Sequence, residues 1–318
     1  MAVIADLLVQ AAQMALVLLL APGLTGLVRK TKARLTRRRG ASVVQPYRDL
    51  LRLLRKEAVL AANASWLFRV TPYLVFAAVW VAAALVPTFA IGLLLGPAAD
   101  VIAIVALLGS ARFFLALAGL DVGTSFGGIG SSREMMIASL AEPAMLMIVF
   151  TLSLLAGTTS LASIADFILG HDVGLRVSLG LALVGLVMVA LAENARIPVD
   201  NPATHLELTM VHEAMVLEYS GRHLALIEAA AAVKLLLYLS LLACLFAPWG
   251  MAGPGAGAAA YALGLAGYLG KLAVGGVLLA LVETGIAKMR VFRVSEFLGG
   301  ALLLGLLGTL LLFVSRSF

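Results

Sequence analysis

Long apolar stretches recur along this chain, and each of them is long enough to cross a lipid bilayer. A bilayer core about 30 Å thick is crossed by roughly 20 apolar residues in an α-helix. Of the 318 residues, 62% are hydrophobic and only 13% are charged, which is far from the composition of a soluble domain. We therefore predict an all-α membrane protein that forms a single integral membrane domain over residues 1–318. About eight transmembrane helices are expected, at residues 4–28, 70–95, 101–120, 135–156, 177–193, 229–248, 261–283 and 297–315.

The lysine and arginine residues gather in the connections on one side of these predicted helices. Twelve lie within residues 29–69, and six more follow the third, fifth and seventh helices. Only Arg176 and Arg316 fall in connections on the other side. Because basic connections stay in the cytoplasm, we predict a multi-pass protein of a bacterial or archaeal plasma membrane with both termini on the outer side. The clustering also argues against nucleic acid as a partner, although the net charge is +6.

The amino-terminal stretch is predicted to be a retained helix. It carries Asp6 near its start, and its first basic residues, Arg29 and Lys30, follow the apolar run, which reverses the order of a cleaved signal peptide. The single cysteine, Cys244, can neither form an internal disulfide nor supply the four thiolates of an iron–sulfur cluster. Any redox centres of this system are therefore expected in other chains.

Residues 46–57 have the pattern of an amphipathic helix that lies along the cytoplasmic surface of the membrane. Pro46 begins the pattern, and a stripe of leucines lies opposite Arg48, Arg52 and Arg55. One interpretation is that the arginines extend to lipid headgroups. The other is that the basic face docks a partner subunit, and the two are compatible.

Several ionisable side chains fall inside the predicted spans, where each costs several kilocalories per mole unless it faces protein or water. They are Arg112, Glu142, Lys234, Lys271 and Glu283, with Glu193 and Glu228 near helix ends. Lys271 and Glu283 are near opposite ends of one helix. The simpler alternative to a functional role is that both side chains extend to the membrane surface. Glu142 and Lys234 lie further from helix ends, so we favour a functional role. Burial raises the pKa of a carboxyl group and a nearby cation lowers it again, so a row of glutamates and lysines can exchange protons near neutral pH.

The densest polar segment, residues 193–221, lies between the fifth and sixth predicted helices. It holds His205, His212 and five carboxylates, at Glu193, Asp200, Glu207, Glu213 and Glu218. His212 and Glu213 begin the H-E-x-x-H pattern of zinc enzymes, but Val216 stands where the second histidine belongs, so we predict no metal site. A solvated acidic loop is the simpler alternative to a functional cluster. Pro198 and Pro202 argue against it, because they stiffen a segment that adjoins membrane helices at both ends.

Residues 127–130 read Gly-Gly-Ile-Gly, which suggests a phosphate-binding loop. No strand precedes the cluster, and its spacing is not that of a dinucleotide-binding motif. We predict a tight cytoplasmic turn before the fourth helix.

An ordered set of motifs resembles subunit 1 of respiratory complex I, the membrane subunit that sits beneath the peripheral arm. The loop carries Arg196-Ile-Pro-Val-Asp200, then Glu207-Leu208, then Glu218-Tyr219-Ser220-Gly221. The homologous subunit of membrane-bound nickel–iron hydrogenases of the formate hydrogenlyase and hydrogenase-4 type is similar at further positions. These are Arg38-Arg39-Gly40, Tyr47-Arg48-Asp49, Arg112-Phe113-Phe114, Gly119-Leu120-Asp121, Ser131-Ser132-Arg133-Glu134 and Glu142-Pro143.

The resemblance implies an eight-helix subunit at the junction of a soluble redox module and a membrane arm. It would hold no redox centre itself: iron–sulfur clusters and a nickel–iron site, or a flavin, belong to peripheral partner subunits, and antiporter-like subunits adjoin it in membrane lipid. By the same likeness the proton path comprises Glu142, Glu193, Asp200, Glu207, Glu213, Glu218 and Lys234, with Arg196 orienting the loop carboxylates.

Departures from the complex I pattern favour the hydrogenase branch. Val199 replaces a phenylalanine, Ala203 and His205 stand where complex I has acidic residues, and Ala41 replaces a proline. We predict a proton-path subunit of a hydrogenase-type complex. A quinone-chamber subunit of an NADH:quinone oxidoreductase, with bound quinone, is the alternative within the family. A secondary ion transporter is the alternative from another class. Many such transporters contain an internal repeat, and the lack of one in this sequence argues against that alternative.

Overall fold

The structure, a computed structural model, describes residues 2–170, 177–200, 210–253, 255–287, 289 and 293–316. Within these ranges it is a bundle of helices with short connections and no strand. The helices are α1 (Ala2–Leu35), α2 (Gln45–Leu54), α3 (Trp66–Leu85), the 3-10 turn η1 (Gly96–Ala98), α4 (Val101–Asp121), α5 (Ser125–Ala156), α6 (Leu161–Gly170), α7 (Val177–Glu193), α9 (His212–Val216), α10 (Gly221–Phe246), α11 (Ala258–Gly285) and α12 (Val294–Arg316).

Seven of the described helices are long and apolar enough to cross a membrane: α1, α3, α4, α5, α10, α11 and α12. The remaining predicted span, 177–193, is the 17-residue helix α7, at the lower end of the length that crosses a bilayer. The all-α membrane fold is therefore confirmed. The short helix α6 was not predicted.

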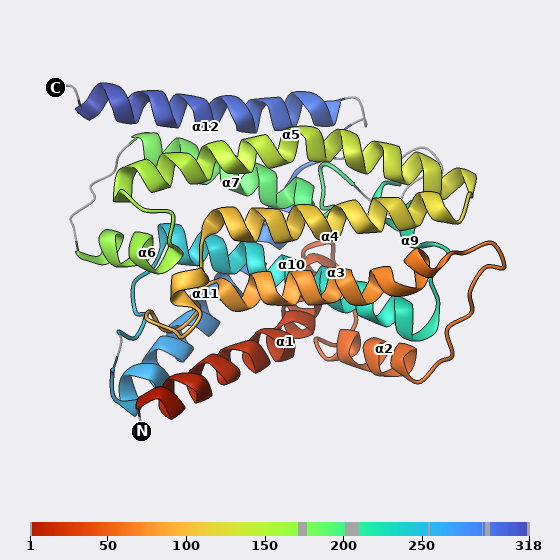
Figure 1. The fold of residues 1–318 in the computed structure, drawn as a ribbon, viewed down its shortest axis with the longest axis horizontal. Coiled ribbons are helices and arrows are strands. Elements are labelled where there is room, and N and C mark those ends of the chain that lie inside the picture. The colour runs from red at the N-terminus through yellow and green to blue at the C-terminus, as the bar shows by residue number, and fades with distance from the viewer. Residues whose placement is uncertain are drawn as a thin grey trace.

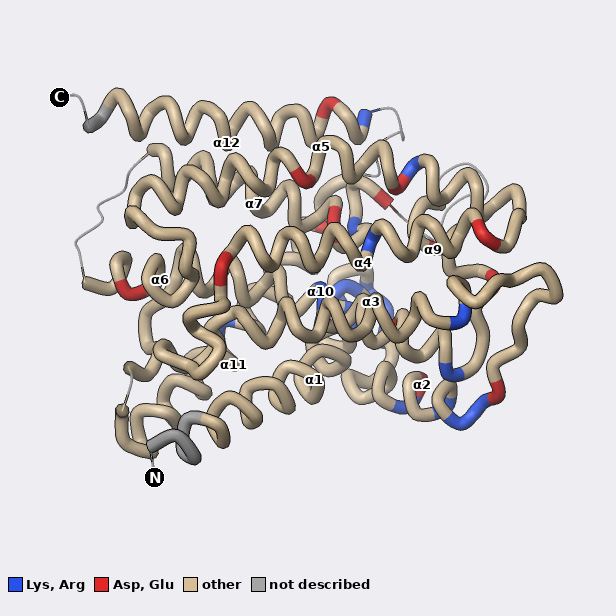
Figure 2. Tube along the Cα trace, in the orientation of Figure 1, with Lys and Arg blue, Asp and Glu red and all other residues tan. Residues whose placement is uncertain are grey.

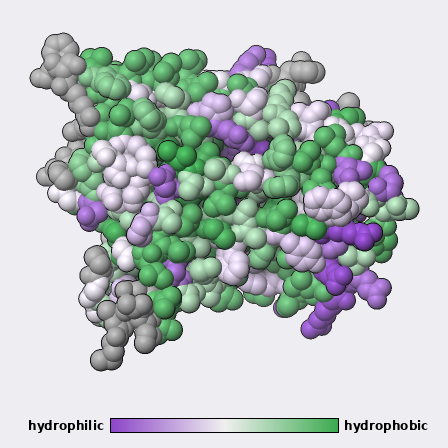
Figure 3. Space-filling view, viewed as in Figure 1, coloured by the Kyte–Doolittle hydropathy of each residue, from purple (hydrophilic) through white to green (hydrophobic). Residues whose placement is uncertain are grey.

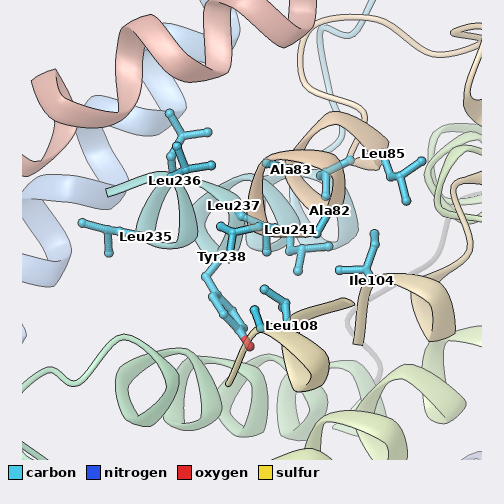
Figure 4. Packing of buried hydrophobic residues seen from close by; sticks show 14 of the residues in the cluster. Ala82, Ala83, Leu85, Ile104, Leu108, Leu235, Leu236, Leu237, Tyr238 and Leu241 are labelled. Atoms are coloured by element: carbon cyan, nitrogen blue, oxygen red, sulfur yellow. The ribbon is translucent and has the colours of Figure 1, made fainter. Parts of the chain in front are cut away.

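The long helices pack one beside the next across the molecule (Figure 1). Helix α12 packs on α5 and α7, α5 on α4, α4 on α3, α3 on α10, α10 on α1, and α1 on α11. Helix α10 is the most buried of the spans. Its residues Leu235, Leu236, Leu237 and Leu241 belong to the buried core, and Tyr238 points from α10 toward Leu108 of α4 (Figure 4).

The prediction that α3 continues to residue 95 is wrong. The helix ends at Leu85, because Pro87 cannot donate to the helical ladder and its ring restricts Val86 to an extended conformation. The carbonyl groups freed at this end lie inside the protein, where they need partners. Gln13 Nε2 donates to the Ala84 and Val86 oxygens at 3.1 and 2.8 Å. The polar glutamine within α1 thus completes the end of another helix.

The predicted turn at residues 127–130 is also wrong, because α5 begins ten residues before the predicted helix and includes the whole glycine cluster. The Thr124 side chain accepts from the Gly127 N–H and caps the helix. A Cβ on Gly127 would overlap the Gly119 carbonyl oxygen of α4, and one on Gly130 would meet Ala214 of α9. The glycines therefore allow close helix packing and do not form a turn.

The predicted interfacial helix is present as α2. Pro46 is buried and Leu50 and Leu53 face the bundle, whereas Arg48 and Arg52 are on the outer side. The leucine stripe is split, since Leu51 and Leu54 lie on the exposed side with the arginines.

The surface and the charge distribution agree with a membrane setting. Large apolar side chains such as Leu303, Val274 and Leu310 are exposed, and the face seen in Figure 3 is mostly hydrophobic, with hydrophilic residues gathered at one end. Both chain ends lie at the same end of the bundle, and most lysines and arginines gather toward the other (Figure 2).

Candidate functional site

Arg112 of α4 stands at the centre of a buried group of carboxylates. Its guanidinium pairs with Glu134 at 3.2 Å, with Glu142 at 3.3 Å and with Glu193. The side chains of Arg112 and Glu193 are 5% and 4% exposed, so bulk water screens this pair little. One cation therefore holds three carboxylates that come from α5 and from the end of α7.

The length of α5 places Glu134 and Glu142 on one side of Arg112. They are eight residues apart, so about two helical turns separate them along the same helix. Gly109 of α4 leaves room for the Glu142 carboxylate, since a Cβ there would be 3.3 Å from its Oε1. The Glu142 side chain is 41% exposed, so this carboxylate reaches the surface of the chain.

Two small cavities adjoin Arg112. The inner cavity, about 40 Å³, is lined by Arg112, Glu134, His212 and Lys234. The terminal cavity, about 10 Å³, is lined by Arg112, Glu142, Glu193 and Tyr238. Lys234 therefore faces other ionisable groups of the protein.

A larger space, the outer cavity, lies between α1, α10, α11 and the segments that flank the undescribed residues 201–209. Its volume is about 350 Å³. Its ionisable lining residues are Arg29, Lys32, Arg196, Asp200, His212, Glu213, Glu228 and Glu283. The two polar segments described on either side of the gap, 194–200 and 210–220, pack into the protein, because Val199, Asp200, Met210 and Val211 are all buried.

Glu283 joins three elements at the wall of the outer cavity. It is 4% exposed and pairs with Lys32 of α1 at 2.9 Å and with Arg196 at 3.4 Å. Burial lowers the pKa of Arg196, and the neighbouring Glu283 carboxylate offsets part of this effect. Arg196 therefore contacts a carboxylate of α11, and its role in orienting the loop carboxylates stays a prediction.

Asp200 fixes the start of α9. Its Oδ2 accepts from the backbone N–H groups of Val211 and His212, each at 3.3 Å. Loss of hydration, followed by the cation of Lys234, lowers the pKa of His212 to about 4. Loss of hydration, followed by the Glu228 and Asp200 carboxylates, raises the pKa of Glu213. Both groups are therefore held toward their neutral forms.

A fourth space, the entry cavity, lies beneath α2 and measures about 220 Å³. It shares Thr25, Arg29 and Glu228 with the outer cavity. The outer and inner cavities share His212, and the inner and terminal cavities share Arg112. The four cavities therefore form a row from α2 to the half-exposed Glu142.

The structure brings most of the predicted path residues into this row. Glu142, Glu193, Asp200, Glu213 and Lys234 each line at least one of the cavities. Glu218 is exposed between α9 and α10 and lines none of them. Glu207 lies outside the described residues.

Several members of the row escaped prediction as path residues. Glu134 was placed ahead of its helix, because the glycine cluster suggested a turn there. The sequence leaves Glu283 open between a functional role and extension to the membrane surface, and in the structure it pairs with Lys32 and Arg196 at the wall of the outer cavity. The Lys271 Nζ donates to the Trp249 carbonyl oxygen at 2.6 Å, and Lys271 lines none of the four cavities.

Comparison with known proteins places the chain in a family. The sequence model of the family described as NADH dehydrogenase matches residues 8–314. The chain belongs to the NADH dehydrogenase family, that of complex I subunit 1. The resemblance drawn from the loop motifs is thus confirmed.

Relatives of this chain come from hydrogenases and from complex I. Formate hydrogenlyase subunit 4 of Escherichia coli K12 is 34% identical over 271 residues, covering 85% of this chain and 87% of that protein. Hydrogenase-4 component C of the same organism is 34% identical over 242 residues, covering 76% and 75%. NADH-quinone oxidoreductase subunit 8 of Rhodothermus marinus is 30% identical over 217 residues, covering 65% and 61%.

The fold of this NADH dehydrogenase family member also occurs in an archaeal respiratory membrane complex. A chain of the membrane-bound sulfane sulfur reductase superposes with a TM-score of 0.80 at 18% identity, covering 96% of this chain and 99% of that one. The likeness supports the helical membrane architecture.

Proposed function

We propose that this chain is the membrane subunit of a hydrogenase-type complex related to complex I and that it carries protons from the peripheral redox arm toward the membrane arm. The observation that carries the proposal is the row of four cavities from α2 to Glu142, whose walls hold ionisable groups throughout. A passive anchor has no use for such a row, because each buried charge is costly in a membrane.

The hydrogenase branch is favoured by two relatives at 34% identity, formate hydrogenlyase subunit 4 and hydrogenase-4 component C. The expected partners are peripheral subunits with iron–sulfur clusters and a nickel–iron site, and antiporter-like subunits in the plasma membrane. The exposed face of α2, with Arg48, Arg52 and Arg55, is suited to a peripheral partner or to lipid headgroups. In this arrangement α2 and the basic connections face the cytoplasm, and both termini lie outside.

In this proposal, a change of charge in the peripheral arm drives the movement of protons along the path. A change of charge near the entry and outer cavities shifts the protonation of Glu228 and Glu213, which face the neighbouring carboxylates. The proton then moves toward Arg112, and the carboxylates around it pass the proton to Glu142. Because Glu142 is half-exposed within a membrane helix, it is the group best placed to deliver a proton to an adjoining subunit.

The test replaces path carboxylates in the assembled complex. Glu142→Gln and Glu207→Gln keep the side-chain shape but remove the titratable group, so both should abolish proton translocation while the complex still assembles. Glu296→Gln is the control, because Glu296 is an exposed carboxylate in the first turn of α12 that lines none of the four cavities. Wild-type translocation in both path variants would contradict the proposal.

Quinone reduction is the second candidate, favoured by the likeness to NADH-quinone oxidoreductase subunit 8. The entry cavity beneath α2 is where a quinone headgroup would be sought. Affinity purification through a tag on this chain separates the candidates: a nickel–iron subunit in the complex selects the hydrogenase, and a flavin-containing NADH module with bound quinone selects the alternative. Ion transport by the purified single chain would select a secondary transporter.

A further inference from the structure

His212 is the one ionisable side chain, among the residues described, that lines both the outer and the inner cavity. The other residues common to the two walls, Ile227 and Ala231, are apolar. A proton that leaves the outer cavity for Arg112 therefore meets a largely apolar boundary with a single imidazole in it.

Among the described residues, each side of this boundary carries one more carboxylate than cations. The outer cavity has three cations, Arg29, Lys32 and Arg196, and four carboxylates, Asp200, Glu213, Glu228 and Glu283. The inner and terminal cavities together have two cations, Arg112 and Lys234, and three carboxylates, Glu134, Glu142 and Glu193. Counted over these described residues alone, each side is neutral when it holds one proton on a carboxylate, and a proton that moves between the sides shifts this balance by one charge.

We propose that His212 is the proton-transfer residue that joins the two carboxylate clusters. This inference rests on the proposed function and names the group on which its central step depends. A protonated carboxyl group of the outer cavity, for which Glu213 is best suited, gives its proton to the unprotonated ring nitrogen of His212. The opposite ring nitrogen then releases its proton to the inner carboxylate Glu134, and the imidazole is again neutral in its other tautomer.

The surroundings of His212 suit this role. Asp200 holds its backbone N–H at 3.3 Å and so fixes the start of α9 between the cavities. The ionisable groups that share a cavity wall with His212 come from five helices and the segments beside α9. They are Arg29 and Lys32 (α1), Arg112 (α4), Glu134 (α5), Glu228 and Lys234 (α10), Glu283 (α11), and Arg196, Asp200 and Glu213 (beside and within α9). The low pKa of the imidazole, about 4, keeps it neutral near pH 7, so it can accept a proton and pass it on without storing charge.

The test compares His212 with a second buried histidine of the same end of the bundle. His223 lies in the first turn of α10, packs edge-on against Tyr73 and lines none of the four cavities. In proteoliposomes that contain the assembled complex, His212→Leu should slow proton translocation on the order of a hundredfold, the low end of what a positioned proton-transfer group contributes. His223→Leu should leave the rate of translocation unchanged.

Chemical rescue separates proton transfer from a structural role. His212→Ala leaves space beside the outer cavity, so added imidazole should restore translocation in this variant and not in His212→Leu. Translocation by His212→Leu at the wild-type rate, or slow translocation by His212→Ala that imidazole does not restore, would overturn the inference. If Glu142→Gln still abolishes translocation in that case, the proposed function stands; if neither variant has an effect, both are refuted.

Discussion

Arg112 shows how a single residue joins the charged groups of the site. A guanidinium cannot lose its proton in a protein, so it remains a fixed cation between Glu134, Glu142 and Glu193. Burial of a carboxylate favours its neutral form, and the nearby cation favours its charged form. The three carboxylates therefore share one cation.

The pH dependence of stability tests the environment of His212. Its pKa is about 4 in the folded protein, below the ordinary 6.5, so stability from neutral His212 is fully present above pH 6.5 and is lost as the pH falls toward 4. The pKa of Glu213 is raised, so its effect on the pH dependence of stability has the opposite sign. The stability that neutral Glu213 contributes is lost as the pH rises above 4.5. The melting temperature of His212→Gln should depend less on pH than that of the wild type between 6.5 and 4. Parallel curves for the two proteins in this window would show that the imidazole is not held neutral.

At the scale of elements, the segment Tyr219-Ser220-Gly221 acts as a clamp between α9, α10 and the chain before α3. The Tyr219 ring stacks on Phe68 at 3.9 Å, and its hydroxyl donates to the Phe68 carbonyl oxygen at 3.1 Å. The Ser220 hydroxyl donates to the Val59 carbonyl oxygen at 3.0 Å. Three residues of the motif that identified the family thus have a structural role, whereas its first residue, Glu218, is exposed.

Gly221 gives this clamp a direct test. Its φ is +52°, and a Cβ would overlap the Glu57 carbonyl oxygen. Gly221→Ala should therefore destabilise the complex by about 1–3 kcal/mol for the backbone conformation, with a further cost for the overlap. Gly180→Ala is the matched control, because Gly180 lies within α7 with nothing near its Cβ position. Thermal unfolding in detergent measures both, and equal melting temperatures for the two variants would refute the clamp.

Element type was predictable from hydropathy, but element ends were not. Apolar runs in the sequence end where a segment leaves the lipid. Helix α3, however, ends at Leu85 inside the protein, shortly before Pro87, and α5 begins before any apolar run. The end of α3 depends on Gln13 of a distant helix, and the start of α5 depends on contacts of Gly127 and Gly130 with α4 and α9. Such partners are fixed by packing, which one sequence does not reveal.

At the scale of the whole molecule, the asymmetry of basic residues sets the expected orientation. Arg52 is exposed on α2, and Gly253 is exposed in the connection before α11. Because Cys244 is buried, the introduced cysteine is the one exposed to the reagent. Arg52→Cys should react with a membrane-impermeant maleimide only in inside-out vesicles, and Gly253→Cys only in right-side-out vesicles. The reverse pattern would place the termini in the cytoplasm.

The site was only partly predictable at this scale. Glu142 and Lys234 were evident, because a charge within an apolar run is conspicuous. The connection between them was not evident, because it passes through Glu134 and His212, which the sequence places in connections between helices, where charges are ordinary. Only the packing of α4 with α5 and α9, and of α3 with α4 and α10, brings these groups to a common cavity.

The most direct measurement is the number of protons translocated per turnover by the assembled complex in proteoliposomes when Glu134 is replaced by Gln. Glu134 is assigned to the path by its contact with Arg112 and its place in the inner cavity. Glu296→Gln is the control, since Glu296 lies in the first turn of α12 and lines none of the cavities. We predict that translocation is lost in Glu134→Gln and retained in Glu296→Gln. A wild-type proton count per turnover in Glu134→Gln would contradict a path through these cavities.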